Sequence, residues 1–456
     1  MKIIVEKIKI LDLSIKNSPY LIILILFFNC SLLMDFHDFY KINPYIFTFL
    51  FLSVLLNLIS TKYWYSILFS FGFSILYYLL QFPRQANHAN LQLFAEIFVL
   101  LLLLYQFISK KNQNLLPSIQ LVFKISLICI YFFAGFHKLN SGFFNVDLSC
   151  ANTIGNQTIS NIFGADYKLN SFVIRFLQFS TLLVELIVPF GLLFKRFQKL
   201  TILILAFFHA ILSWSNYADF SAFAGFLILA STLTLNNKEF SINNSDLKVY
   251  IGFVLLSILI EIILIPFYLE RATISFYTGS VFSIGFLYFF INYLKKHSFS
   301  LIGISKINSL IISFCCVLFF LVWSLKTYFG FGNMANLTMF SNLNTEKNYS
   351  NHYLINTKYT KLVDFEEDNV KIIALHDTLK NLRLEGFKLP IVDFKYKTKN
   401  WTKHYNNMIL NATIVYKNDT LIIKDLKESQ FSKSEWYYKY LFFRKIQDDG
   451  NTGCFW

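Results

Sequence analysis

Long runs of apolar residues, separated by short polar loops, occupy the first three quarters of the chain. A helix that crosses the roughly 30 Å hydrocarbon core of a bilayer needs about 20 mostly apolar residues. Eleven segments meet this requirement approximately, namely residues 19–36, 43–60, 63–82, 91–109, 115–138, 171–194, 200–215, 221–235, 249–269, 274–294 and 310–331. The pattern predicts an all-α polytopic membrane helix bundle, with about 11 transmembrane helices, over residues 1–331.

The pattern changes after residue 331, where apolar and polar residues alternate as they do in strands. Residues 411–416 and 420–424 flank an Asn/Asp turn at 417–419 and predict a β-hairpin. Residues 370–375 and 391–396 are two further predicted strands. We therefore expect a second, small β-rich domain over residues 332–456.

Composition agrees with a membrane protein. The chain is 55% hydrophobic and only 15% charged, whereas soluble domains are about 25% charged. This excludes an ordinary cytosolic enzyme and makes the lipid bilayer the first expected partner. The net charge of +14 does not point to nucleic acid, because most basic residues of the membrane part lie in short loops and no dense basic patch with interleaved aromatic residues occurs.

The distribution of basic residues predicts an orientation, because Lys and Arg favour cytoplasmic loops. With a cytoplasmic N-terminus, fifteen basic residues fall in inner loops and five in outer loops. An odd number of spans then places residues 332–456 outside. The expected localisation is a multi-pass inner (cytoplasmic, plasma) membrane with an extracytoplasmic C-terminal domain. The first apolar segment is interpreted as a retained helix, since it lacks a small-residue cleavage site.

Two cysteines are expected on the outside, where disulfides form. Cys150 and Cys454 can pair there or remain apart, since sequence does not give their distance. The remaining cysteines lie in apolar segments and are interpreted as packing residues. No CxxC or HExxH spacing occurs, so no metal site is expected.

Inserting a charged side chain at the centre of a membrane helix costs about 2.5–3.5 kcal/mol, so each such residue is a candidate for a structural or functional role. Lys138 ends the fifth apolar segment, and Ala134 and Gly135 lie beneath it on the same helix face, which leaves room for a ring or a neighbouring backbone. A lysine in apolar surroundings can act as a base, or it can extend to the headgroups. His137 is turned about 100° away and serves another surface.

Other membrane groups also have two interpretations. His209 is either a core histidine or a ligand, and Glu185 can bond the backbone that Pro189 frees. Glu96 is expected to pair with a lysine or to be protonated. Lys124 and Glu261 are interpreted as helix-pairing groups.

An ordered set of residues resembles the membrane domain of the vitamin K-dependent gamma-carboxylases and their bacterial relatives, the HTTM (horizontally transferred transmembrane) family. The set covers about residues 80–235 and comprises Asn87 and His88, Tyr131-Phe-Phe-Ala-Gly135 with Lys138 and Leu139, Glu185 with Pro189, and Phe208 and His209 followed by Ser221 and Phe223. The stretch Asn336–Asn342, with Ser350 and His352, is similar to one in bacterial HTTM-like proteins.

The resemblance implies a reduced-quinone site, with vitamin K or menaquinone hydroquinone as cofactor and CO2 and O2 as co-substrates of a carboxylase-type lyase. Lys138 would then be the base, His88 its hydrogen-bonding helper and His209 an inward-facing histidine, while Ala134, Gly135 and Glu185 would line the cofactor site. The substrate would be an exported peptide or protein. The alternative is a non-catalytic membrane scaffold or a transporter-like bundle.

Overall fold

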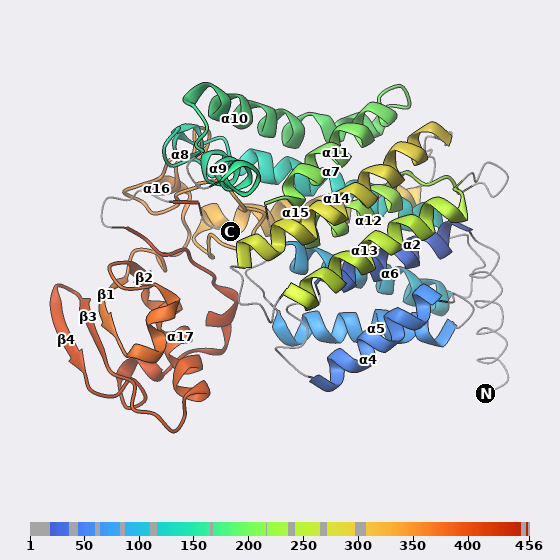
Figure 1. The fold of residues 1–456 in the computed structure, drawn as a ribbon. Helices are drawn as coiled ribbons and strands as arrows, with labels where there is room; N and C mark the ends of the chain where they lie inside the picture. Colours follow the sequence, from blue (N-terminus) through green and yellow to red (C-terminus); the bar gives the residue numbers. More distant parts are fainter. Residues whose placement is uncertain are drawn as a thin grey trace.

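The structure, a computed structural model, describes residues 19–35, 44–59, 64–82, 87–109, 116–164, 167–215, 217–235, 242–264, 271–296, 307–447 and 453–454 (Figure 1). Most of the described chain is helical, with thirteen α-helices of 14 residues or more. The interpretation of the chain's first residues lies outside the described part, as do several of the loop lysines that predict the orientation.

Each of the eleven predicted apolar segments contains most of one apolar helix. These are α2 (Pro19–Met34), α4 (Pro44–Ile59), α5 (Trp64–Gln81), α6 (Asn87–Ser109), α7 (Leu116–His137), α10 (Ser171–Leu186), α11 (Gln198–Ser213), α12 (Ala218–Thr232), α13 (Asn244–Leu264), α14 (Arg271–Lys296) and α15 (Ile307–Leu325). A 3-10 turn, η1 (Val188–Leu193), follows α10 where Pro189 removes a backbone donor.

Four of these helical segments are long and apolar enough to cross a membrane, namely Leu116–His137, Ser171–Leu193, Asn244–Leu264 and Thr273–Lys296, and seven further apolar helices are shorter. The outward face of α10 shows why such a chain needs lipid. Phe172, Phe176 and Phe179 follow one another at helical spacing and are 78%, 65% and 61% exposed. A contiguous apolar stripe of this kind is unstable in water and stable against acyl chains. The structure therefore indicates a membrane protein.

Helix α7 lies inside the bundle, in contact with α10, α12 and α15. Its residues are buried on nearly all sides, because the sequence is apolar around the whole helix. Aromatic packing fills much of the rest of the core; Phe27 of α2 stacks on Tyr250 of α13 with ring centroids 4.3 Å apart. The ends of α7 are thereby fixed against three neighbours, which positions the side chains at its C-terminus.

Short elements cover the end of the bundle at which α7 finishes. They are α8 (Ser141–Phe144), α9 (Cys150–Phe163), η4 (Lys326–Phe329) and α16 (Thr357–Thr360). A disulfide joins Cys150, the first residue of α9, to Cys454, with Cα atoms 4.7 Å apart. The disulfide thus connects Cys454 to the elements that cover the bundle (Figure 1).

The C-terminal part contains a four-stranded antiparallel sheet in the order β2-β1-β3-β4 (Figure 1). Its strands are β1 (Asn369–Leu375), β2 (Lys388–Pro390), β3 (Ala412–Tyr416) and β4 (Asp419–Ile423), with the short 3-10 turns η5 (Asp377–Leu382), η6 (Gln430–Ser432) and η7 (Trp436–Tyr440) around it. The predicted hairpin is confirmed as β3 and β4. Lys417 and Asn418 form its turn with φ angles of 52° and 70°, the left-handed pair that suits the twist of two-residue hairpins.

The predicted strand at 391–396 is wrong, because these residues begin helix α17 (Ile391–His404). The alternation of apolar and polar residues is too short to decide between the two structures. Over the longer stretch, Ile391, Phe394 and Thr398 are buried at helical spacing. Asp393 and Lys397 then pair one turn apart on the same helix.

Candidate functional site

Lys138 lies directly after α7 and is enclosed by protein. Its side chain is 2% exposed, and its Nζ lies 2.8 Å from Oε2 and 3.0 Å from Oε1 of Glu185. It also donates to the carbonyl of Ala134 at 3.3 Å and to that of Met339 at 3.2 Å. The lysine therefore does not extend to the headgroups. Glu185 binds this ammonium rather than backbone freed by Pro189.

Gly135 explains how α10 comes close enough for this pair. A Cβ atom at Gly135 would lie 2.8 Å from Cγ of Leu186 and 2.9 Å from Cβ of Glu185. Both distances are shorter than van der Waals contact, so only glycine admits α10 at this depth. Of the two occupants that the sequence allowed above Ala134 and Gly135, the structure contains the neighbouring helix. This face does not fit a quinone ring.

A strained segment covers Lys138 from the other side. Four non-glycine residues have positive φ angles, namely Ala335 (62°), Leu337 (66°), Phe340 (55°) and Asn342 (52°). Left-handed backbone costs roughly 1–2 kcal/mol for each such residue, and strain of this kind concentrates at functional sites. Met339, within the segment, supplies the carbonyl that Lys138 binds.

Buried amide side chains hold the strained segment in place. Asn87 accepts from the backbone N–H of Leu337 at 2.7 Å, and Asn140 donates to the carbonyl of Ser341 at 2.6 Å. The Asn342 carboxamide accepts from the backbone N–H of Cys150 at 2.8 Å, beside the disulfide. These hydrogen bonds join the segment to α6, to the end of α7 and to α9, and so they fix its backbone above the lysine.

His209 lies deeper in the bundle than Lys138. Its Nε2 hydrogen-bonds the hydroxyl of Tyr131, which precedes Lys138 by seven residues and so faces the same way on α7. Within the described part of the chain, Nδ1 of His209 is buried and has no hydrogen-bond partner. Tyr131 and His209 therefore form a buried polar pair on the face of α7 that also bears Lys138.

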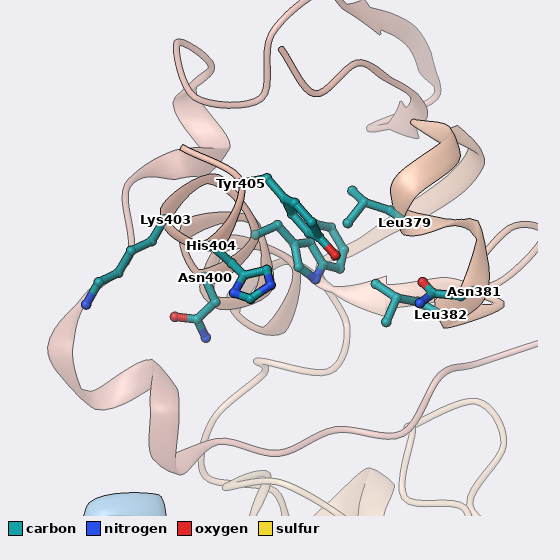
Figure 2. A pocket seen from close by; sticks show the side chains of 8 residues that line it. Leu379, Asn381, Leu382, Asn400, Lys403, His404 and Tyr405 are labelled. Atoms are coloured by element: carbon teal, nitrogen blue, oxygen red, sulfur yellow. The ribbon is translucent and has the colours of Figure 1, made fainter. Parts of the chain in front are cut away.

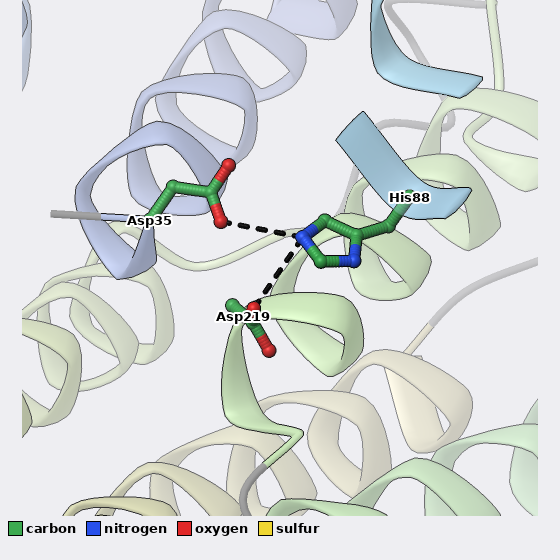
Figure 3. A group of neighbouring side chains, drawn as sticks. All are labelled: Asp35, His88 and Asp219. Carbon is green, nitrogen blue, oxygen red and sulfur yellow. Dashed lines mark ion pairs between the residues drawn. The ribbon is translucent and has the colours of Figure 1, made fainter. Parts of the chain in front are cut away.

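His88 belongs to a different cluster. Its Nε2 lies 3.4 Å from Oδ1 of Asp35 and 3.4 Å from Oδ2 of Asp219, so the imidazole stands between two carboxylates (Figure 3). Among the described residues, the contacts of Lys138 do not include His88. The predicted helper role is therefore not supported by this geometry. Asp35 and Asp219 were missed because each lies at an end of an apolar helix, and no local motif connects either of them with His88.

His137 faces another surface, as predicted. Its Nδ1 lies 2.8 Å from the Tyr328 hydroxyl, and its Nε2 lies 2.7 Å from the Ser324 hydroxyl. His352 packs on Tyr328 with ring centroids 5.2 Å apart, and its Nε2 bonds the carbonyl of Phe136 at 2.9 Å. Burial lowers the pKa of His352, and its hydrogen bond to the Phe136 carbonyl opposes that change. These contacts anchor the tail to the end of α7.

Two further membrane groups have structural environments. Glu96 accepts hydrogen bonds from Ser74 at 2.6 Å and from Gln92 at 3.4 Å, rather than pairing with a described lysine. Lys124 is 5% exposed, and no described residue pairs with it, which contradicts the interpretation of this lysine as a helix-pairing group.

A second group of buried charges lies at the start of the tail. Lys361 pairs with Glu366 and with Glu367, and Arg444 pairs with Glu346. Burial raises the pKa of Glu366 to about 7; Glu346 adds to the rise, and Lys361 opposes it. This cluster holds the tail's connecting segments together, and no residue of the predicted site belongs to it.

The tail also has a pocket of about 610 Å³ between η5 and the end of α17 (Figure 2). Its lining is mainly apolar and aromatic, with Leu379, Leu382, Trp401 and Tyr405 beside polar Asn381, Asn400, Lys403 and His404. None of the residues predicted for the site lines it.

Comparison of the sequence with protein families, with curated proteins and with solved structures finds no match.

Proposed function

We propose that this chain is an integral membrane enzyme of the carboxylase-like type that the resemblance implies, with Lys138 as its base. One observation carries the proposal. An almost fully buried ammonium lies 2.8 Å from the Glu185 carboxylate beneath a segment with four strained residues. Strained backbone that specific hydrogen bonds retain is concentrated at functional sites, so it favours a positioned reactive group over a simple packing contact.

Lys138 and Glu185 together can hold and move one proton. Transfer of that proton from Nζ to Oε2 gives a neutral amine and a carboxylic acid, and the amine can then accept a proton from a substrate. The carbonyls of Ala134 and Met339 keep Nζ in place during this exchange. Burial excludes water, which would compete for the proton.

Reduced quinone, CO2 and O2 remain the proposed cofactor and co-substrates. When bound, a reduced quinone would supply the acidic hydroxyl and the reducing power that carboxylase-like chemistry needs. The faces of Ala134 and Gly135 are covered by α10. The segment around Met339 covers the opposite side, so a ring reaches Lys138 only if that segment moves aside.

If the tail is extracytoplasmic, as the loop charges predict, Lys138 lies at the extracytoplasmic end of the bundle. An exported peptide or protein is therefore the proposed substrate. Protein purified from membranes should carry a lipid-soluble quinone that mass spectrometry detects, and co-expressed exported peptides should contain γ-carboxyglutamate. Lys138→Met should abolish the modification. Lys168→Met, which replaces an exposed lysine, is the matched control and should retain it.

A second candidate function is a non-catalytic scaffold. An ammonium has three protons to donate, and the structure provides three acceptor groups, namely Glu185, Ala134 and Met339. This saturation is typical of a helix-pairing lysine. If well-folded protein contains no quinone, and Lys138→Met changes only stability, the scaffold is the correct function.

A further inference from the structure

We infer that Asp35, His88 and Asp219 form a binding site for one divalent transition-metal ion, such as Zn²⁺, at the end of the bundle. Asp35 directly follows α2, while His88 and Asp219 lie in α6 and α12, so the three residues are far apart in the sequence. One potential ligand atom from each lies within 4.8 Å of the other two. Figure 3 shows the imidazole directed between the two carboxylates.

The distances fit metal ligands better than hydrogen bonds. Nε2 of His88 lies 3.4 Å from each carboxylate oxygen, beyond the usual N–H···O range of about 2.7–3.2 Å. A single ring N–H also cannot donate fully to two carboxylates. Zinc binds His nitrogen and carboxylate oxygen at about 2.0–2.2 Å, so two such ligands on a tetrahedral ion stand about 3.4 Å apart.

The ligand types narrow the choice of ion. One imidazole nitrogen suits Zn²⁺ and similar transition metals, whereas Ca²⁺ prefers six to eight oxygen atoms. Two carboxylates that face one imidazole concentrate negative charge at the end of three apolar helices. A dication placed between these ligand atoms would interact favourably with that charge.

Neighbouring groups orient the proposed ligands, as they do in metal sites. The Tyr78 hydroxyl donates to Oδ2 of Asp35 at 2.7 Å, which leaves Oδ1 facing His88. The backbone N–H of Phe220 donates to Oδ1 of Asp219 at 2.7 Å, which leaves Oδ2 facing His88. Each carboxylate therefore presents one oxygen to the same point.

The site is open on one side. Asp35 is 5% exposed, but His88 and Asp219 are 16% and 32% exposed, so an ion can enter and a water molecule can complete its coordination. Three protein ligands and one open position are typical of zinc sites that react with substrates. The inference does not depend on the role of Lys138.

Metal binding by the purified full chain tests the inference. Protein that is stripped with a chelator and then incubated with excess Zn²⁺ should retain about one equivalent of Zn²⁺ after desalting, measured by elemental mass spectrometry. Co²⁺ should give the visible absorption of a low-symmetry nitrogen and oxygen site, and Ca²⁺ should not displace it. Retention of much less than one equivalent, or no Co²⁺ absorption, overturns the inference.

Variants locate the ion. His88→Ala should abolish the Co²⁺ absorption, while His404→Ala, an imidazole in the tail pocket, should leave it unchanged. Tyr78→Phe removes only the orienting hydroxyl and should weaken Zn²⁺ binding about tenfold. Tyr416→Phe breaks a comparable Tyr–Asp hydrogen bond in the tail and should have no effect. Equal metal affinity in all four variants would place the ion elsewhere.

Discussion

Replacement of Gly135 by alanine should destabilise the bundle, although alanine favours helices. Alanine in place of glycine within a helix stabilises by about 1 kcal/mol. Against this, the new Cβ would lie 2.8 Å from Leu186 and 2.9 Å from Glu185, and overpacking costs about 1–3 kcal/mol. If α10 moves away, the Lys138 ammonium loses its carboxylate, which costs about 3–5 kcal/mol for a buried pair. We expect a net loss of about 3 kcal/mol.

Unfolding by denaturant in detergent micelles measures this loss. Gly252→Ala is the matched control, because an added Cβ there has nothing within 4 Å, and it should leave stability equal or slightly higher. Adding Leu186→Ala to Gly135→Ala should recover part of the loss, since Leu186 supplies two of the three close atoms. If Gly135→Ala proves as stable as Gly252→Ala, α10 does not approach α7 as described, and the pair at Lys138 has another origin.

Four further outcomes follow from the described contacts. Lys138→Met or Glu185→Leu alone should each lower the free energy of unfolding by about 3–5 kcal/mol, because each leaves one buried charge without its partner. The double variant should lose much less than the sum, since its apolar pair leaves no buried charge. Additive losses in this double-mutant cycle would contradict the ion pair. Of the six cysteines, four should react with maleimide in denaturant and all six only after reduction, because Cys150 and Cys454 are joined. A cysteine introduced on the tail surface should be labelled from outside intact cells; protection there would reverse the proposed topology. Burial raises the pKa of Glu366 from 4.5 to about 7, so the folded state binds the proton more tightly than the unfolded state does. The free energy of unfolding should therefore be highest below pH 4.5 and should fall by up to about 3 kcal/mol as the pH rises through 7. Unfolding curves at several pH values measure this change, and Glu366→Gln should remove it.

The apolar helices could be predicted from sequence because one property, the length of the apolar run, decides them. An apolar run of sufficient length has few alternatives to a helix when backbone groups must be satisfied internally. The same argument fails in the tail, where water can satisfy the backbone. Residues 391–396 alternate as a strand would, yet the buried residues that follow at helical spacing make them the start of α17.

The cluster at His88 could not be predicted from spacing. Asp35, His88 and Asp219 are separated by 53 and 131 positions in the sequence, and no local motif joins them. They meet because α2 and α7 end, and α6 and α12 begin, on the same side of the bundle. A sequence pattern can indicate which end of a helix bears a polar group, but the lateral order of helices depends on packing between apolar faces. That order brings the three side chains together.

Around Lys138, helical spacing determines which residues of α7 lie beneath the lysine, whereas packing between helices determines what covers them. Helical geometry places Ala134 and Gly135 beneath the lysine in any fold that contains α7. Whether that space holds a ligand or a neighbouring helix depends on α10, and α10 comes close because a glycine faces it at the level of Glu185. The remaining side of the lysine is covered by Met339, from a segment that is strained at four residues and held by buried asparagines. Strain that is compensated by so many specific hydrogen bonds is a costly way to cover an ion pair, and this cost is the strongest structural argument that the lysine is positioned for chemistry rather than for packing alone.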